Sequence, residues 1–201
     1  MNYFLRIGAY LLHPMLMPLL GAFLYYIVTP RFLEPQLIRA KLFAIVIVTI
    51  LIPIITFFLL KNLRLVESIH LKNVAERKLP LMIQCVLLLL IVRIVYDSYE
   101  SPELYYFFVG VLFTALTALI LVFLKFKVSL HQMAIAGVTV FLIGLSAHFQ
   151  INMLLWIAFC FFCNGWVASS RLFTNSHTYP ELVAGFVIGA LPQLILFNFW
   201  L

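Results

Sequence analysis

Long apolar stretches separated by short polar ones dominate the chain. Seven such stretches lie at about 7–30, 42–60, 79–96, 104–124, 128–147, 151–169 and 182–201. A membrane-spanning helix needs about 20 mostly apolar residues, and these stretches have about that length. They are also unbroken, whereas the strands of a membrane β-barrel alternate apolar and polar residues. The pattern predicts an all-α, polytopic membrane helix bundle with about seven transmembrane helices, forming a single integral membrane domain over residues 1–201.

The first stretch contains several helix-breaking signals. His13 is followed by Pro14, and Pro18 lies four residues further on, so we expect a kink or a broken helix there. The N-terminal segment has one basic residue and lacks a small-x-small cleavage site, and we therefore do not interpret it as a signal peptide.

The composition agrees with a lipid-embedded chain. Apolar residues make up 65% of the sequence and charged residues 10%, against about 25% charged in soluble domains. So few charges cannot cover a soluble surface, which argues against soluble-cleft catalysis and nucleic-acid binding. The three cysteines lie in apolar stretches, and we interpret the Cys160-x-x-Cys163 pair as small core residues.

With seven spans, the polar segments 61–78, 125–127 and 170–181 reach the same membrane face as the N-terminus. The last of them contains Ser170-Arg171, five residues, His177, three residues and Glu181. Residues four apart share one face of a helix, so we expect Glu181 to accept a hydrogen bond from His177. That bond would orient the ring and leave the other nitrogen as a nucleophile or base.

Two further elements reach the same face. One is Lys127-Val128-Ser129-Leu130-His131, and the other is the basic cluster from Lys72 through Arg77 and Lys78 to Pro80. Two histidines, a carboxylate, serines and basic groups therefore converge at one interface. No metal and no other cofactor is needed to explain them. We interpret His13 and His148, by contrast, as interfacial or packing histidines.

The order of these elements resembles that of the type-2 phosphatidic acid phosphatase superfamily of integral membrane lipid phosphatases. The motifs of that family are Lys-x6-Arg-Pro, Pro-Ser-Gly-His and Ser-Arg-x5-His-x3-Asp, and the resemblance covers about 72–190. The chain is a divergent match, because Leu79 stands at the arginine of the first motif, and Val128 and Leu130 replace proline and glycine in the second. Glu181 replaces the aspartate of the third motif.

The resemblance implies a six-helix phosphatase-like core plus one helix, in a bacterial inner membrane. It implies hydrolysis of a lipid phosphomonoester or pyrophosphate, with His177 as the nucleophile that forms a phosphohistidine, Glu181 as its orienting carboxylate and His131 as the acid for the leaving group. The implied partners are a lipid phosphate and the bilayer. The implied phosphate-binding residues are Lys72, Arg77, Lys78, Ser129, Ser170 and Arg171.

Other interpretations stay open at this point. A catalytically impaired member of the same fold could bind or transport a lipid phosphate with the same basic groups. A retinal protein would need a lysine in the last span, and residues 182–201 contain none. A secondary transporter would be expected to carry ionisable residues near the middle of the membrane, whereas nearly all of those in this chain lie at the ends of the apolar stretches, with only Arg93 ambiguous.

Membrane orientation is also open. Nine of the 13 basic residues fall on the face of the motifs, which by the positive-inside rule favours the cytoplasm. Four of them, however, are phosphate-binding candidates, and without these the two faces carry five and four.

Overall fold

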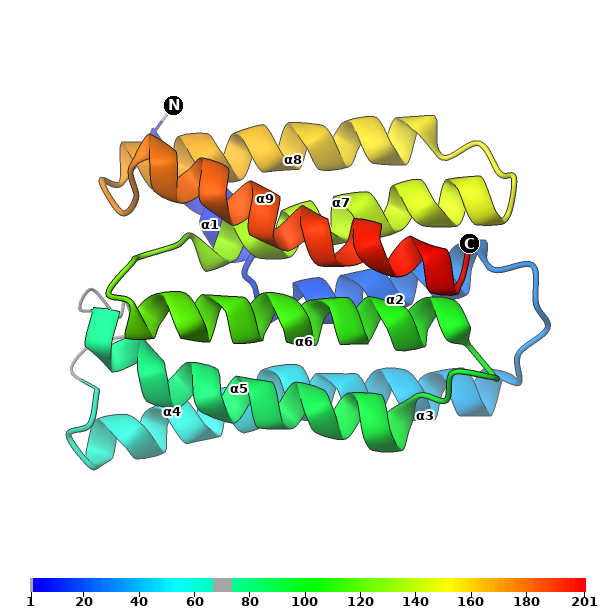
Figure 1. The fold of residues 1–201 in the computed structure, drawn as a ribbon, viewed down its shortest axis with the longest axis horizontal. Helices are drawn as coiled ribbons and strands as arrows, with labels where there is room; N and C mark the ends of the chain where they lie inside the picture. The colour runs from blue at the N-terminus through cyan, green and yellow to red at the C-terminus, as the bar shows by residue number, and fades with distance from the viewer. Residues whose placement is uncertain (1, 67–73) are drawn as a thin grey trace.

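The chain forms a bundle of helices that run side by side along its long axis (Figure 1). The computed structural model describes residues 2–66 and 74–201, and these contain helices, turns and loops but no strand. The helices are α1 (Asn2–Leu11), α2 (Met17–Val28), α3 (Pro35–Val46), α4 (Ile52–Asn62), α5 (Lys78–Leu90), α6 (Pro102–Phe123), α7 (Leu130–His148), α8 (Leu154–Phe173) and α9 (Tyr179–Leu196). Short π-helical turns (η1, Ile47–Leu51; η3, Ile91–Val95) and 3-10 turns (η2, Val74–Arg77; η4, Phe197–Phe199) extend or join them.

Several helices are suited to a membrane. Within the described residues, five helical segments are long and apolar enough to cross one: Pro35–Asn62, Val74–Val95, Pro102–Phe123, Leu130–His148 and Tyr179–Phe199. The prediction of an all-helical chain with several membrane-crossing helices is therefore confirmed, whereas the number seven is not. Helix α2 is apolar but shorter, and α8 carries Asn164 and Arg171 along its 20 residues.

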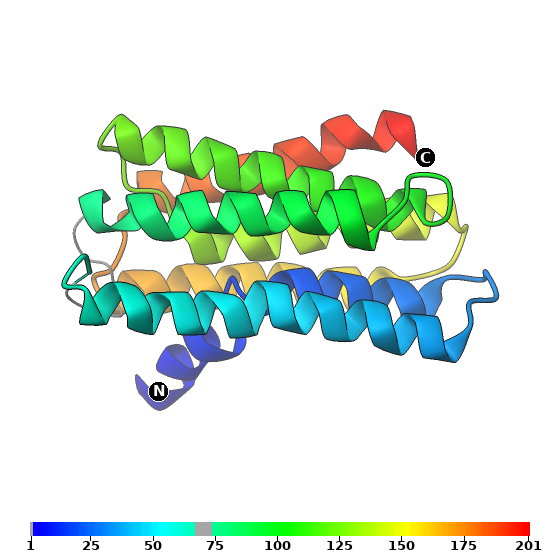
Figure 2. The same cartoon turned by 90° about the horizontal axis from the view of Figure 1, so that it is seen from below.

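The first apolar stretch is broken where its prolines predicted. Helix α1 ends at Leu11 and α2 begins at Met17, with Pro18 in its first turn. Figure 2 shows α1 leaving the bundle at an angle, while α2 runs within it. Helix α1 exposes Tyr3, Ile7 and Tyr10 on one side.

Helices α3 and α4 form one long rod through the π-helical turn η1. Pro53 has no backbone N–H, so the regular hydrogen-bond ladder cannot continue through it. The N–H of Ile52 bonds instead to the carbonyl of Ile47, five residues back. This rod is the least buried of the five candidate spans and forms an outer wall of the bundle.

Helices α7 and α9 make the closest contact in the bundle. Gly185 and Gly189 of α9 face the backbone of α7, where a Cβ on Gly185 would lie 3.0 Å from the Ser129 carbonyl. A Cβ on Gly189 would overlap the backbone of Met133. The glycines thus allow backbone-to-backbone packing, as a G-x-x-x-G pattern does between membrane helices.

At the end of the bundle where α6 begins and α7 ends, the helices α2, α6 and α7 meet at a buried carboxylate. Glu103, in the first turn of α6, is fully buried and accepts a hydrogen bond from Arg31 at 2.6 Å and from the Tyr25 hydroxyl at 3.2 Å. The Nε2 of His148, at the end of α7, lies 3.1 Å from the same carboxylate. His148 is therefore part of a polar cluster that ties α2, α6 and α7 together.

We expect Gly189→Ala to destabilise the protein by about 1–3 kcal/mol, the usual cost of adding an atom to a tightly packed contact. The added methyl group must push α9 away from the Met133 backbone. Thermal unfolding in detergent measures the loss. Gly165→Ala is the matched control, because nothing lies within 4 Å of a Cβ at Gly165. Equal melting temperatures for the two variants would contradict the packing described here.

We expect Glu103→Ala to destabilise the protein by up to about 3 kcal/mol, the lower end of the range for breaking a buried ion pair, because Arg31 is partly exposed. The variant leaves Arg31, Tyr25 and His148 without their shared acceptor. Glu34→Ala removes the same charge from an exposed residue and should leave the unfolding midpoint unchanged. A similar loss in both variants would show that charge alone is responsible.

Candidate functional site

The three motif segments come together at one end of the bundle, where α5, α7 and α9 begin and α6 and α8 end (Figure 1). Arg77 donates to the carbonyl of Val128 at 3.1 Å, which joins the first segment to the second. Lys127 donates to the carbonyl of Ser176 at 2.7 Å, which joins the second to the third. The sequence predicted that these segments meet, because the loops that contain them reach one membrane face, and this meeting is present in the described residues.

His177 and Glu181 form a hydrogen-bonded pair at the start of α9. Nδ1 of His177 lies 2.7 Å from Oε2 of Glu181, the contact that the spacing predicted. The geometry behind it differs from the prediction, because α9 begins at Tyr179 and His177 lies before the helix. Glu181 also accepts a hydrogen bond from the Thr178 backbone N–H at 3.1 Å, as in a capping box. The turn at the helix start therefore fixes the carboxylate, and the carboxylate fixes the imidazole.

The surroundings of His177 favour its neutral form. Burial, together with the nearby Lys127 and Arg77, lowers the pKa of His177 to about 4, against an opposing contribution from Glu181. At neutral pH the ring is then uncharged, with the Nδ1 hydrogen donated to Glu181. Nε2 carries the lone pair, and no hydrogen bond to it occurs within the described residues. This is the state of an imidazole that can act as a nucleophile.

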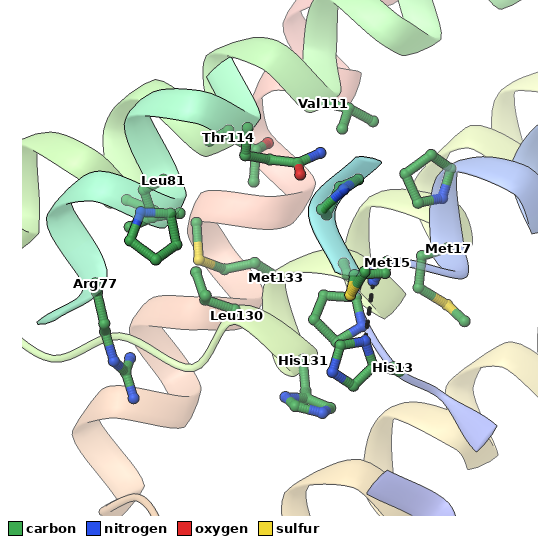
Figure 3. A pocket seen from close by; sticks show the side chains of 18 of the residues that line it. His13, Met15, Met17, Arg77, Leu81, Val111, Thr114, Leu130, His131 and Met133 are labelled. Atoms are coloured by element: carbon green, nitrogen blue, oxygen red, sulfur yellow. Dashed lines mark hydrogen bonds between the residues drawn. The ribbon is translucent and has the colours of Figure 1, made fainter. Parts of the chain in front are cut away.

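A cavity of about 1270 Å³ opens beside this pair (Figure 3). Its polar end is lined by His177, His131 and the basic side chains Arg77, Lys127 and Arg171. Burial lowers the pKa of the Lys127 ammonium, and the positive charges of Arg77 and Arg171 lower it further. The Nε of Arg171 is buried without a hydrogen-bond partner among the described residues. Cations crowded in this way favour an anion with several oxygens, such as a phosphate.

His131 faces the cavity from the first turn of α7 and is oriented by α1. Its Nε2 lies 3.1 Å from the carbonyl of Ala9, so this nitrogen carries the hydrogen and Nδ1 is the basic one in the neutral ring. The ring of His13 packs edge-on against His131, with the ring centres 5.2 Å apart. Figure 3 shows the two rings side by side in the cavity wall.

Some predicted phosphate-binding residues lie elsewhere. Ser129 is the N-cap of α7 and is fully buried, with its hydroxyl accepting from the Gln132 N–H. Ser170 is also buried and is absent from the cavity wall, although its hydroxyl has no partner in the described residues. The Lys78 ammonium lies 5.0 Å from the centre of the Phe123 ring, away from the cavity. Lys72 lies outside the described residues.

Other cavity residues were not predicted from the sequence. Lys127 was noted only as part of a motif, His13 was interpreted as a packing histidine, and Arg6 and Tyr10 of α1 were not considered. For the α1 residues, the sequence signal was the break at His13-Pro14, where the chain changes direction between α1 and α2. No group of three or more His, Cys, Asp or Glu side chains suited to a metal ion occurs in the described residues.

Comparison of the chain with family models, with curated proteins and with solved structures finds no match.

We expect the pKa of His177 to rise in Lys127→Gln, because a positive charge that disfavours the imidazolium is removed. NMR titration of labelled histidine measures this, with His177→Ala identifying the resonance. The wild-type ring should titrate near pH 4. Lys125→Gln removes the same charge from an exposed residue of the same loop and should leave the pKa unchanged. A wild-type pKa above 6.5 would contradict the burial and charge arrangement described above.

Proposed function

We propose that the chain is a membrane lipid phosphatase that hydrolyses a lipid phosphomonoester or pyrophosphate through a phosphohistidine on His177. The observation that supports this most directly is the neutral, carboxylate-oriented His177 facing Arg77, Lys127 and Arg171 across one cavity. A nucleophile with a free lone pair, opposite a set of donors for phosphate oxygens, is what a phosphoryl transfer requires.

In the first step, Nε2 of His177 attacks phosphorus as the bond from phosphorus to the lipid oxygen breaks. The negative charge on the other phosphate oxygens is stabilised by the basic side chains lining the cavity. His131 takes up a proton at Nδ1 as the anionic phosphate binds, and donates that proton to the departing lipid oxygen while its Nε2–H stays bonded to Ala9. General acid catalysis of this kind contributes about 10²–10⁴-fold in rate.

In the second step, a water molecule attacks the phosphohistidine. Nδ1 of His131, now without its proton, accepts a proton from that water, and the bond between phosphorus and Nε2 breaks. Inorganic phosphate leaves, and His131 returns to its starting protonation state. Glu181 keeps its hydrogen bond to Nδ1 of His177 throughout, so that the ring is presented in the same orientation for both steps.

The membrane setting follows the same proposal. We propose seven membrane passes in a bacterial inner membrane, formed by α1 with α2, α3 with α4, and α5 to α9 singly. All three motif segments then lie at one face of the membrane, where the phosphate of a membrane lipid is found. A lipid phosphate could therefore reach the site without leaving the bilayer.

A second candidate is a lipid-phosphate-binding or lipid-transport protein of the same fold with impaired catalysis. Ser129 is committed to capping α7, and Lys78 packs on Phe123, so two of the implied phosphate ligands do not reach the cavity. Such a protein would keep the anion-binding cavity without turnover.

We expect the purified protein to release phosphate from at least one of phosphatidate, phosphatidylglycerol phosphate, isoprenyl pyrophosphate and lipid A phosphate. His177→Ala should lower kcat at least about 10³-fold, as expected when a nucleophile is removed. Glu181→Asp should retain activity if its role is to orient the ring. Release of phosphate at an unchanged rate by His177→Ala would falsify the assignment, and phosphate-lipid binding without any release would favour the second candidate.

Two lysines provide a matched pair for the phosphate site. Lys127→Ala should raise KM for the lipid phosphate about tenfold, the equivalent of about 1.4 kcal/mol of lost binding. Lys78→Ala removes the same charge one segment away and should have little effect, because its ammonium lies on Phe123. Steady-state kinetics on both variants decide between these outcomes, and the reverse order would contradict the assignment of Lys127 to the site.

A further inference from the structure

The cavity does not end at the charged site but continues between the helices. Beyond His131 and His177 its wall is formed mainly by apolar side chains from α4, α5, α6 and α7 (Figure 3). We call this part the inner chamber; its lining includes Phe57, Leu81, Leu88, Val111, Met133 and Val138.

The inner chamber reaches deep into the bundle. Its lining includes Gln193 of α9, which lies twelve residues beyond Glu181. At 1.5 Å per residue this is about 18 Å along the helix axis. The hydrocarbon core of a bilayer is about 30 Å thick, so this depth exceeds half of that thickness.

Its size and lining fit a hydrocarbon chain. The whole cavity measures about 1270 Å³, more than the 300–1,000 Å³ of typical small-molecule pockets. A phosphate group occupies only the charged end, and the apolar remainder offers few hydrogen-bond partners for water. An apolar chain covalently joined to the phosphate would fill both parts at once.

The inner end of the chamber is polar. Gln193 is 1% exposed, and its Nε2 donates to the Phe107 carbonyl at 3.0 Å. Its Oε1 has no hydrogen-bond partner among the described residues, although Gln193 lines the cavity. With almost no accessible surface, this oxygen is not offered to a ligand in the cavity.

The chamber also has an opening to the bilayer. Ile54 and Phe58 of α4 line the cavity and are 41% and 54% exposed, so the cavity reaches the outer surface along α4. This outer rod is the least buried of the candidate spans. A chain could therefore pass sideways from the membrane into the bundle beside α4.

We propose that the inner chamber binds the hydrocarbon tail of the lipid whose phosphate lies against Arg77, Lys127 and Arg171, so that the tail leaves the bilayer and enters the bundle. The identity of the headgroup rests on the proposed function; the apolar chamber joined to a cationic site does not.

The test uses a lipid phosphonate that carries a photoreactive diazirine at the end of its tail. The phosphonate cannot be hydrolysed, so binding is measured whether or not the protein is an enzyme. After irradiation of the protein in lipid nanodiscs, mass spectrometry locates the label. We expect label on chamber residues of α6 and α7, such as Val111 and Met133, that an excess of unlabelled phosphonate removes. Competition-sensitive label found only on lipid-facing residues would overturn the proposal.

Two neighbouring tryptophan substitutions supply the matched variants. Ala115 lines the chamber, so Ala115→Trp should lower chamber labelling at least about tenfold, the effect of losing about 1.4 kcal/mol of binding. Leu116, the next residue, is 37% exposed and lies outside the cavity wall, so Leu116→Trp should leave labelling unchanged. Equal labelling of the two variants would also overturn the proposal. The wild-type pattern decides the matter alone if Ala115→Trp does not fold.

A parallel assay of phosphate release separates this inference from the proposed function. Label in the inner chamber without phosphate release from any lipid phosphate would reject the proposed phosphatase activity and support binding of the tail in the inner chamber. Phosphate release without label in the inner chamber would support the phosphatase activity and reject binding of the tail in the inner chamber.

Discussion

The close packing of α7 on α9 is the contact on which the candidate site depends. His131 lies in the first turn of α7, and the His177–Glu181 pair lies at the start of α9. Because Gly185 and Gly189 let the two backbones touch, His131 and His177 come to one cavity although they are 46 residues apart in sequence. A wider spacing of the two helices would separate the proposed nucleophile from the proposed acid.

The charge distribution at the two ends of the bundle differs in kind. At one end, Glu103 and Glu100 are paired with Arg31 and Lys41, so charge there is compensated within the protein. At the other end, basic side chains crowd around the cavity, and the carboxylate of Glu181 is directed to His177. Paired charges chiefly stabilise the bundle, whereas crowded charges of one sign cost stability unless an anion is bound. This contrast is the physical reason for assigning structure to one end and ligand binding to the other.

The sequence predicted the helical class, the break near Pro14 and the meeting of the three motifs, because apolar length, proline chemistry and chain parity determine these features. It predicted the contact between His177 and Glu181, but it attributed this contact to a shared helical face, whereas His177 makes it from the turn before α9. It could not predict which way Ser129 and Lys78 point, since capping and packing on a ring depend on neighbours distant in sequence. Nor did it predict His13 in the cavity wall, because the path of α1 is set by contacts with α8, such as the bond from Trp166 to the Phe4 carbonyl.

Through the hydrogen bond between His131 and the Ala9 carbonyl, the candidate site includes a residue outside the three motif segments. The three motif segments lie between about residues 72 and 190, yet the acceptor that fixes the tautomer of His131 is a main-chain carbonyl of α1. A backbone carbonyl is the same for every residue type, so no sequence pattern can record this contribution. The site therefore depends on the packing of α1 against α8. Any event at the membrane surface that lifts α1 from α8 would remove the acceptor that holds the hydrogen of His131 on Nε2, while leaving every motif residue in place.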